Sequence, residues 1–415
     1  MRIVSCRIVV VATLLPLVLA AQDRPRGREL GIPFPGTPGR HNAITDVPGV
    51  TVGQVTLMAG DGPIRPGVGP IRTGVTAIHP RGADNLAPVH AGFFSLNGAG
   101  EMTGTHWVAE SGLLDGPILI TGTHSVGVVR DATIAWQVAR GQSLVFSLPV
   151  VAETFDVLND ANGGHVTAAH VRLALDSARS GPVAEGAVGG GTGMLCNGYK
   201  GGIGTTSRVV RLGERSYTLG VLVQCNYGGR LQILGVPMGP VPPERQLCAT
   251  TRPTRAWIAD VPACAATRTG AMHPEPGQVG RGSIIVIVAT DAPLLPHQLT
   301  RLARRVGLGL GALGSSAGNS SGDLFLAFST APAQSWPTSA LDAPSLEPIA
   351  LTMLPHEALG PFFQATVHAT EEAVVNAMLA APAVFDGADG LRAFGLPGER
   401  VMTALRKAGL VPPAR

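Results

Sequence analysis

Five consecutive β-branched residues, Ile284 to Val288, limit the folds open to this chain. An apolar run of this kind, bounded by turn residues, predicts a central buried strand at 284–290. A helix is expected directly after it, because the next apolar residues recur at helical spacing: Leu295, Leu299, Leu302, Val306 and Leu310. A buried strand that leads straight into a helix indicates mixed packing, so we expect an α/β or α+β fold.

Shorter patterns predict the other elements. Runs of β-branched residues between Gly, Pro and Asp indicate strands at 50–57, 74–79, 118–121, 144–151, 217–224 and 324–329. Helical spacing predicts helices at 166–179 and 370–381, the second with Glu371 and Glu372 in its first turn. Residues 22–39 show neither pattern and are expected to be disordered. Since no internal repeat is visible, we expect a single domain.

Composition excludes two classes of protein. Hydrophobic residues make up 45% of the chain and charged residues 14%, which is too apolar for a disordered protein. Aromatic residues reach only 4% and the net charge is +3. Neither base stacking nor a basic phosphate footprint is therefore expected, and we predict no nucleic-acid partner.

The first twenty residues have the pattern of a signal peptide. Arg2 and Arg7 precede an apolar run at 8–20, which ends in the small residues Ala20 and Ala21. The run is too short to span a bilayer comfortably, and a buried N-terminal strand is the alternative. We expect residues 1–20 to be removed, leaving 21–415 as an exported protein, periplasmic or secreted, with no membrane span.

Four cysteines remain after the signal peptide. Cys248 and Cys264 bracket a Pro- and Thr-rich stretch, and in an oxidising compartment they are candidates for a disulfide. Cys196 and Cys225 lie among glycines and β-branched residues, where free buried cysteines are common. The spacing of the cysteines and histidines fits no metal site, so we predict no bound metal.

Two short motifs are judged to be coincidental. The glycine run at 186–193 resembles a phosphate loop but lacks the Gly-Lys-Ser/Thr ending, so close backbone packing is the expected role. Residues 314–318 match Gly-x-Ser-x-Gly, but the expected helix lies before the motif and a strand after it, the reverse of a nucleophile elbow.

Ser283 follows Gly282 at the start of the central strand, and motifs along the whole chain accompany this pair. Together they resemble the L-aminopeptidase/D-esterase and β-peptidyl aminopeptidase family, whose members cleave themselves before such a serine. The motifs that carry the resemblance are residues 42–50, 73–77, 149–154, 189–192, 200–205, 226–228, 318–323 and 371–373. The resemblance implies a four-layer αββα sandwich, and a cut that gives chains 21–282 and 283–415 without metal or organic cofactor.

The resemblance also assigns roles to single residues. Ser283 would be the nucleophile, with Ser321 and Asp323 orienting it and relaying its proton. Ser-Gly-Asp spacing on an extended segment places both side chains on one face, which supports the pair. Asn226 matches an oxyanion-hole asparagine and Glu153 a carboxylate that binds the substrate's amino group. Their alternative roles are those of turn, cap or surface residues.

One position departs from the family pattern. Phe155 stands where the family has a hydroxyl-bearing aromatic residue, and a phenyl ring donates no hydrogen bond. The interval between Asn226 and Ser283 is also longer than usual, and we expect it to reshape the rim of the pocket. Substrate preference is therefore the property that the resemblance predicts least.

The expected function is release of N-terminal residues, β- and D-amino acids among the candidates, from small peptides, amides or esters. An acyl-enzyme on Ser283 would carry the reaction. The alternatives are an amide hydrolase or acyltransferase of the same fold, or an inactive exported binding protein. The resemblance further implies a homo-oligomer of processed heterodimers.

Overall fold

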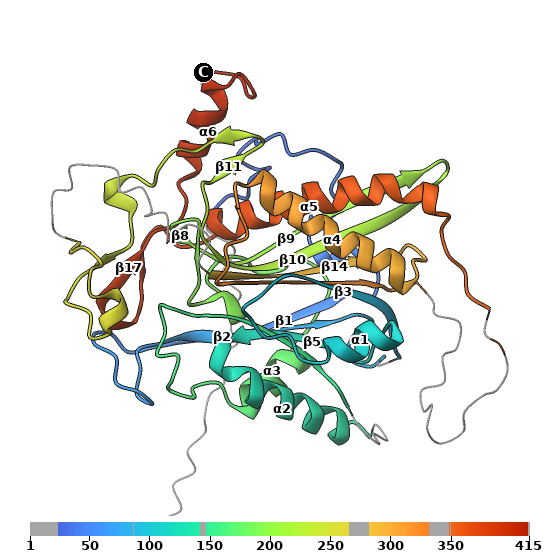
Figure 1. The fold of residues 1–415 in the computed structure, drawn as a ribbon, viewed down its shortest axis with the longest axis horizontal. Helices are drawn as coiled ribbons and strands as arrows, with labels where there is room; N and C mark the ends of the chain where they lie inside the picture. Colours follow the sequence, from blue (N-terminus) through green and yellow to red (C-terminus); the bar gives the residue numbers. More distant parts are fainter. Residues whose placement is uncertain are drawn as a thin grey trace, which may run out of the picture.

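The computed structural model describes residues 24–85, 87–141, 147–264, 282–331, 348 and 350–413. Two β-sheets lie face to face, and each carries helices on its outer side (Figure 1). The four-layer αββα sandwich is thus confirmed. The predicted signal peptide at 1–20 lies outside the described residues. Within those residues, none of the helices combines the length and the apolar character needed to cross a membrane.

The larger sheet has six strands in the order β4-β3-β15-β14-β10-β9. Their bounds are β3 Val89–Gly98, β4 Leu113–Leu114, β9 Gly202–Leu212, β10 Arg215–Tyr227, β14 Gly282–Thr290 and β15 Ser321–Ser329. β14 is the predicted central strand: Ile284 and Val286 face one hydrophobic core, whereas Ile285 and Ile287 face another. It pairs with β15 in parallel, since α4 (Pro296–Ala312) connects the two strands as a crossover.

The smaller sheet has four strands in the order β1-β2-β5-β6. Their bounds are β1 Thr51–Ala59, β2 Ile71–His79, β5 Ile118–Gly122 and β6 Val150–Thr154. The outer face of this sheet is covered by α2 (Val126–Ala139) and α3 (Ala168–Asp176). The strand predicted at 144–151 is displaced toward the C-terminus, with 144–146 outside the described residues. This displacement places Glu153 inside β6.

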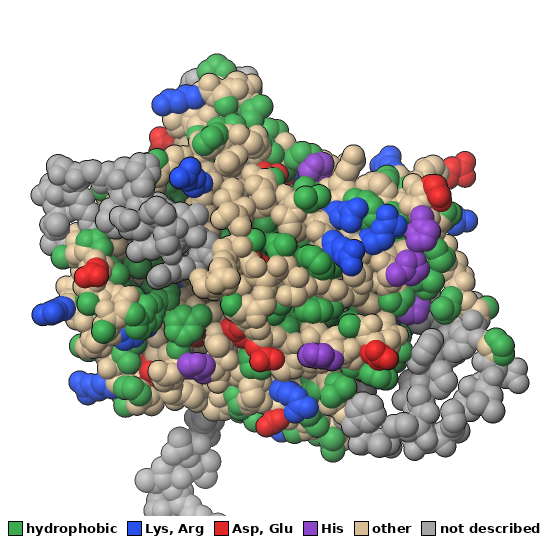
Figure 2. Space-filling model, viewed as in Figure 1, with side chains coloured by type: hydrophobic (Ala, Val, Ile, Leu, Met, Phe, Trp, Pro, Cys, Tyr) green, Lys and Arg blue, Asp and Glu red, His purple; other side chains and the backbone are tan. Residues whose placement is uncertain are grey.

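Helices α4 and α5 (Gly360–Leu379) cover the outer face of the larger sheet. The sequence correctly predicted α4, whose residues include Arg301, Arg304 and Arg305. Lys and Arg side chains gather over the part of the molecule where Figure 1 shows α4 (Figure 2). The start of α5 was predicted too late: the helix begins at Gly360, and its first turn contains a proline, which is tolerated there. Glu371 and Glu372 therefore lie in the buried middle of α5, where neighbouring segments supply their partners.

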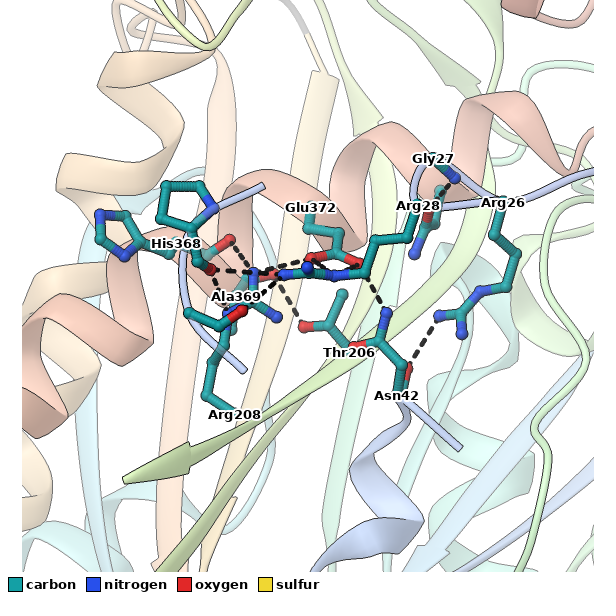
Figure 3. Close-up of polar contacts among 12 residues, drawn as sticks. Arg26, Gly27, Arg28, Asn42, Thr206, Arg208, His368, Ala369 and Glu372 are labelled. Carbon is teal, nitrogen blue, oxygen red and sulfur yellow. Dashed lines mark hydrogen bonds and ion pairs between the residues drawn. The ribbon is translucent and has the colours of Figure 1, made fainter. Parts of the chain in front are cut away.

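The segment after residue 24 is ordered, which corrects the prediction of disorder at 22–39. Arg28 Nε lies 3.0 Å from the buried carboxylate of Glu372, which also accepts from Arg208 at 2.7 Å and Asn42 at 2.5 Å (Figure 3). Arg26 Nη2 donates to the carbonyl of Asn42 at 2.8 Å. These long-range contacts tie the start of the chain to β9 and α5, and no local pattern could have indicated them.

Both cysteine pairs form disulfides in the structure. Cys248 is joined to Cys264, closing the loop between them. Cys196 is joined to Cys225, so the prediction that these two cysteines are free was wrong. The two segments are distant in sequence but run side by side: Asn197 N–H donates to the carbonyl of Tyr227 at 2.7 Å. This register brings Cys196 against Cys225.

The remaining elements are short. The helices are α1 Thr105–Ser111 and α6 Gly398–Lys407. The strands are β7 Leu195–Cys196, β8 Tyr199–Lys200, β11 Gln232–Ile233, β12 Val236–Pro237, β13 Cys248–Ala249, β16 Phe385–Asp386 and β17 Leu391–Ala393. The 3₁₀ helices are η1 Ile44–Asp46, η2 Thr123–Ser125, η3 Gly189–Gly191, η4 Pro243–Arg245, η5 Ala256–Ile258, η6 His356–Leu359 and η7 Ala388–Gly390.

Candidate active site

Strand register brings two of the predicted site residues, Ser283 and Asn226, side by side at one end of the larger sheet. Ser283, at the start of β14, lies opposite Asn226 of β10 on one side and Gly322 of β15 on the other. Its hydroxyl is only slightly exposed, since the whole residue is 6% accessible, and Oγ accepts from the Gly322 N–H at 3.1 Å. A nucleophile candidate therefore sits at the centre of three neighbouring strand ends.

Ser321 and Asp323 face the same side of β15, as their spacing predicted. Ser321 Oγ donates to Asp323 Oδ1 at 2.6 Å. The other carboxylate oxygen accepts from Asn97 Nδ2 at 3.2 Å. Burial raises the pKa of Asp323, while the hydrogen bonds from Ser321 and Asn97 lower it. Sequence reasoning missed Asn97, because it comes from β3 and meets Asp323 only through the sheet.

The residue before the nucleophile can only be glycine in this geometry. Gly282 has φ +117°, a region that side-chain-bearing residues rarely adopt. A Cβ built on it would lie 2.0 Å from the Asn226 carbonyl oxygen and 2.9 Å from Tyr227 Cα. The carbonyl that Ser283 would attack during self-cleavage thus belongs to a tightly packed left-handed residue. This supports the role expected for Gly282, whose missing Cβ permits the approach.

Backbone groups on two sides fix the side chain of Asn226. Its Oδ1 accepts from the Leu195 N–H at 2.9 Å, and its Nδ2 donates to the Phe155 carbonyl at 3.0 Å. A side-chain amide has two N–H groups, and among the described residues only Phe155 accepts from this one. The second N–H remains available to stabilise negative charge next to Ser283.

A buried lysine lies behind Asn226, and the sequence analysis gave it no role. Lys200 Nζ donates to the carbonyls of Gly191, Met194 and Gly201 at 3.2, 2.8 and 2.7 Å, which uses all three N–H donors of an ammonium group. The Met194 carbonyl belongs to the same peptide group as the Leu195 N–H that holds Asn226. Burial lowers the pKa of Lys200 well below its usual value. The sequence offered one sign that Lys200 is unusual, since the chain contains only two lysines and this one lies among glycines.

Glu153 is buried rather than a surface charge. It is 4% exposed, and its carboxylate accepts from the Glu101 N–H at 2.9 Å and from the Thr123 hydroxyl. Burial raises the pKa of Glu153, and the hydrogen bonds from Thr123 and Glu101 partly offset this. A fixed carboxylate in a partly dehydrated site is suited to binding a substrate's ammonium group.

A cavity of about 1510 Å³ joins these groups. Ser283, Asn226, Glu153 and Phe155 all line it, whereas Ser321 and Asp323 belong to β15, the strand paired with β14, and do not line the cavity themselves. Trp257, from the loop between Cys248 and Cys264, also lines the cavity, which supports the expectation that this interval shapes the rim. Among the described residues, no group of three or more His, Cys, Asp or Glu side chains is placed to hold a metal.

The structure agrees with the interpretation that both motifs are coincidental. The glycine run forms η3, where a Cβ on Gly191 would lie 2.5 Å from the Ile203 backbone nitrogen, so close packing explains it. The Gly-x-Ser-x-Gly match lies between α4 and β15, in the order opposite to that of a nucleophile elbow.

Comparison with known proteins places these features in one family. The model of "Peptidase family S58" matches residues 42–392. A β-peptidyl aminopeptidase from Sphingosinicella microcystinivorans is 47% identical over 401 residues, covering 96% of both chains. Among solved structures, a Burkholderia sp. β-aminopeptidase is 44% identical, with TM-score 0.79 over 94% of this chain and 100% of the other.

A second solved structure defines the fold. The L-aminopeptidase D-Ala-esterase/amidase from Ochrobactrum anthropi, described as a variant of the Ntn hydrolase fold, is 44% identical with TM-score 0.77. The match covers 93% of this chain and 99% of that one. The family expected from the sequence motifs is confirmed: the chain belongs to peptidase family S58 and has this Ntn-hydrolase type of fold.

Proposed function

We propose that this member of family S58 cuts its own chain between Gly282 and Ser283 and then uses Ser283 to release N-terminal residues from small peptides, amides or esters. The chain is a serine-type aminopeptidase, as the named relatives are. The observation that carries the proposal is the register Asn226–Ser283–Gly322 across three strands. This register puts Ser283, Asn226 and the Ser321–Asp323 pair at one end of a sheet, which supports their proposed roles as nucleophile, oxyanion donor and orienting pair.

In the maturation step, Ser283 Oγ attacks the carbonyl carbon of Gly282. The C–N bond between the two residues breaks, an ester forms on Oγ, and the α-amino group of Ser283 is released with the proton that the hydroxyl lost. Water then hydrolyses the ester, which leaves a carboxylate on Gly282 and a free serine at the new N-terminus. The absence of a side chain at Gly282 supports this step, because no Cβ stands beside the carbonyl that is attacked.

Catalysis repeats this chemistry on a substrate. The α-amino group of Ser283, with an ordinary pKa of about 7.7–8.0, accepts the hydroxyl proton as Oγ attacks. The Ser321 hydroxyl, itself donating to Asp323, orients the nucleophile and relays the proton toward the leaving amine. The free N–H of Asn226 stabilises the oxyanion. Water hydrolyses the resulting acyl-enzyme.

Glu153 makes the enzyme an aminopeptidase rather than an endopeptidase. Its carboxylate lines the same cavity as Ser283 and would pair with the ammonium group of the substrate. Only a chain terminus carries that group, so substrates would be cut one residue from their end. Residues whose amino group lies one carbon further from the carbonyl, as in the substrates named for the β-peptidyl relatives, are among the candidates.

Maturation would also include export. The pattern of residues 1–20 and the two disulfides support passage into an oxidising compartment, periplasmic or extracellular. The mature enzyme would consist of residues 21–282 and 283–415, assembled as a homo-oligomer of these heterodimers. The size of the purified native protein, measured by light scattering, tests the assembly.

Intact mass and N-terminal sequencing of the purified protein, with Ser283→Ala beside it, test the central claim. We expect two chains from the wild type, one beginning Ser-Ile-Ile-Val, and one uncut chain from the variant. Uncut wild-type protein that hydrolyses aminoacyl amides would refute the self-cleavage mechanism. Cut protein without turnover on any such amide would refute the assigned activity.

A further inference from the structure

The loop between Cys248 and Cys264 forms one wall of the catalytic cavity. The disulfide closes its base, where the Ala249 N–H donates to Pro262 O and the Cys264 N–H donates to Ala249 O, each at 2.9 Å. A covalent link and two backbone hydrogen bonds thus restrict the base of the loop. The loop tip, η5, is therefore carried on a restrained base.

The tip of this loop is anchored independently of the disulfide. Ile258 packs into a small hydrophobic core with Leu158 and Phe385. Arg255 Nε lies 3.2 Å from the buried carboxylate of Asp389, and Arg255 Nη1 donates to the Val157 carbonyl at 2.9 Å. These contacts anchor the chain on both sides of Ala256 and Trp257, which restricts the backbone that carries the Trp257 ring.

Trp257 is nevertheless exposed toward the cavity. The residue is 60% accessible, and its ring lies 6.0 Å from the ring of Phe155, which is 37% accessible. The Arg255 guanidinium lies 5.1 Å from the Trp257 ring, a distance at which a cation and an indole attract each other. Two large aromatic side chains that are held in place yet left open to a cavity indicate a binding surface.

The neighbours of Phe155 show which part of a substrate would reach this surface. Thr123 donates to the Glu153 carboxylate, and the adjacent His124 ring contacts the Phe155 ring at 6.4 Å. The Phe155 carbonyl also accepts from the oxyanion amide of Asn226. Phe155 is therefore a neighbour both of the carboxylate proposed to bind the ammonium group and of the amide proposed to bind the scissile carbonyl. In a bound substrate, the side chain of the N-terminal residue projects from the backbone between these same two points.

We propose that Phe155 and Trp257 form an aromatic subsite for a large apolar or aromatic side chain on the N-terminal residue of the substrate. This inference rests on the proposed function and adds the class of substrate that the site favours. It also explains why a phenyl ring suits position 155: in this subsite the ring supplies apolar contact area, for which no hydroxyl is needed.

The test compares two series of aminoacyl p-nitroanilides, L-α and β³, each with alanine-, leucine- and phenylalanine-type side chains on one leaving group. Trp257→Ala is expected to lower kcat/KM for the two larger side chains about threefold to tenfold, mainly through KM, and to leave the alanine type unchanged. Trp257→Phe should restore most of the preference. Leu308→Ala is the matched control, because Leu308 is 63% exposed but lies on α4.

The outcomes separate the subsite from the activity. An equal loss of kcat/KM on all three side chains would overturn the proposed subsite, because Trp257 would then act on the leaving group or on the fold. No loss of kcat/KM on any of them would also overturn it, because Trp257 would then make no contact that matters. If Trp257→Ala yields no folded, cut protein, Phe155→Ala provides the same comparison from the other ring. A wild-type enzyme that is cut but hydrolyses none of the anilides contradicts the proposed activity instead.

Discussion

Replacing Gly282 with alanine should slow the maturation cut about 100-fold. The new Cβ would lie 2.0 Å from the Asn226 carbonyl oxygen, whereas real Cβ contacts begin near 3.0 Å, so the backbone must move by about 1.0 Å. A misplacement of that size in reacting atoms typically costs on the order of 10²-fold in rate. The left-handed φ of +117° adds conformational strain of roughly 1–3 kcal/mol in the uncut chain.

The assay follows the conversion of newly translated protein into two chains, sampled over time and resolved by mass. Gly98→Ala is the matched control: Gly98 lies opposite Gly322 in the same sheet, but a Cβ there would meet nothing within 4 Å. Comparison of the thermal melting curves of Gly282→Ala and uncut Ser283→Ala shows whether the Gly282→Ala chain is folded. If a folded Gly282→Ala chain matured at the rate of Gly98→Ala, the steric argument would be refuted.

Four further perturbations test the site. Asn226→Ala should lower kcat about 100- to 1,000-fold in steady-state assays of cut protein. Lys200→Met should lower kcat when it is introduced into the wild type, but should cause no further loss of kcat when it is added to Asn226→Ala. A double-mutant cycle in which the two losses multiply would contradict this coupling. Burial raises the pKa of Glu153, so KM should rise as pH falls through that raised pKa, and Glu153→Gln should abolish this dependence. Burial also raises the pKa of Asp156 to about 7, so the folded chain keeps a proton that the unfolded chain loses near 3.8, and stability falls as pH rises between these values. The melting temperature of Asp156→Asn minus that of the wild type should therefore be more positive at pH 8 than at pH 4.

Local pattern was enough to predict the frame of the site. The β-branched run at 284–290 and the apolar residues at helical spacing after it predicted the bounds of β14 and α4 to within a few residues. Burial on both faces of a strand and the amphipathicity of a helix both leave a pattern in neighbouring residues. The i, i+2 spacing of Ser321 and Asp323 likewise predicted that they share a face, which their 2.6 Å hydrogen bond confirms. Family motifs, not periodicity, supplied Asn226 and Glu153.

What the sequence did not predict depends on contacts between distant segments. Lys200 supports Asn226 through the backbone of Met194 and Leu195. Neither the antiparallel pairing of β7 with β8 nor the closeness of these strands to β10 has a local signature in the sequence. Cys196 meets Cys225 for the same reason. Glu372 looked like a helix-start residue, because acidic residues favour the first turn, yet three partners from elsewhere in the chain make it a buried anchor.

The strand order of the larger sheet has a consequence for the cut protein. A break before Ser283 would leave β14 and β15 in one polypeptide and β3, β4, β9 and β10 in the other, so the central pair would be hydrogen-bonded on both sides to a separate molecule. Unfolding would then release two species, and their return to the sheet would be a second-order encounter whose yield depends on concentration. The uncut Ser283→Ala chain would refold as a single body. At high dilution the unfolded mature enzyme should therefore fail to refold. Its stability is then kinetic, because it is set by the rate of unfolding and not by the refolding equilibrium.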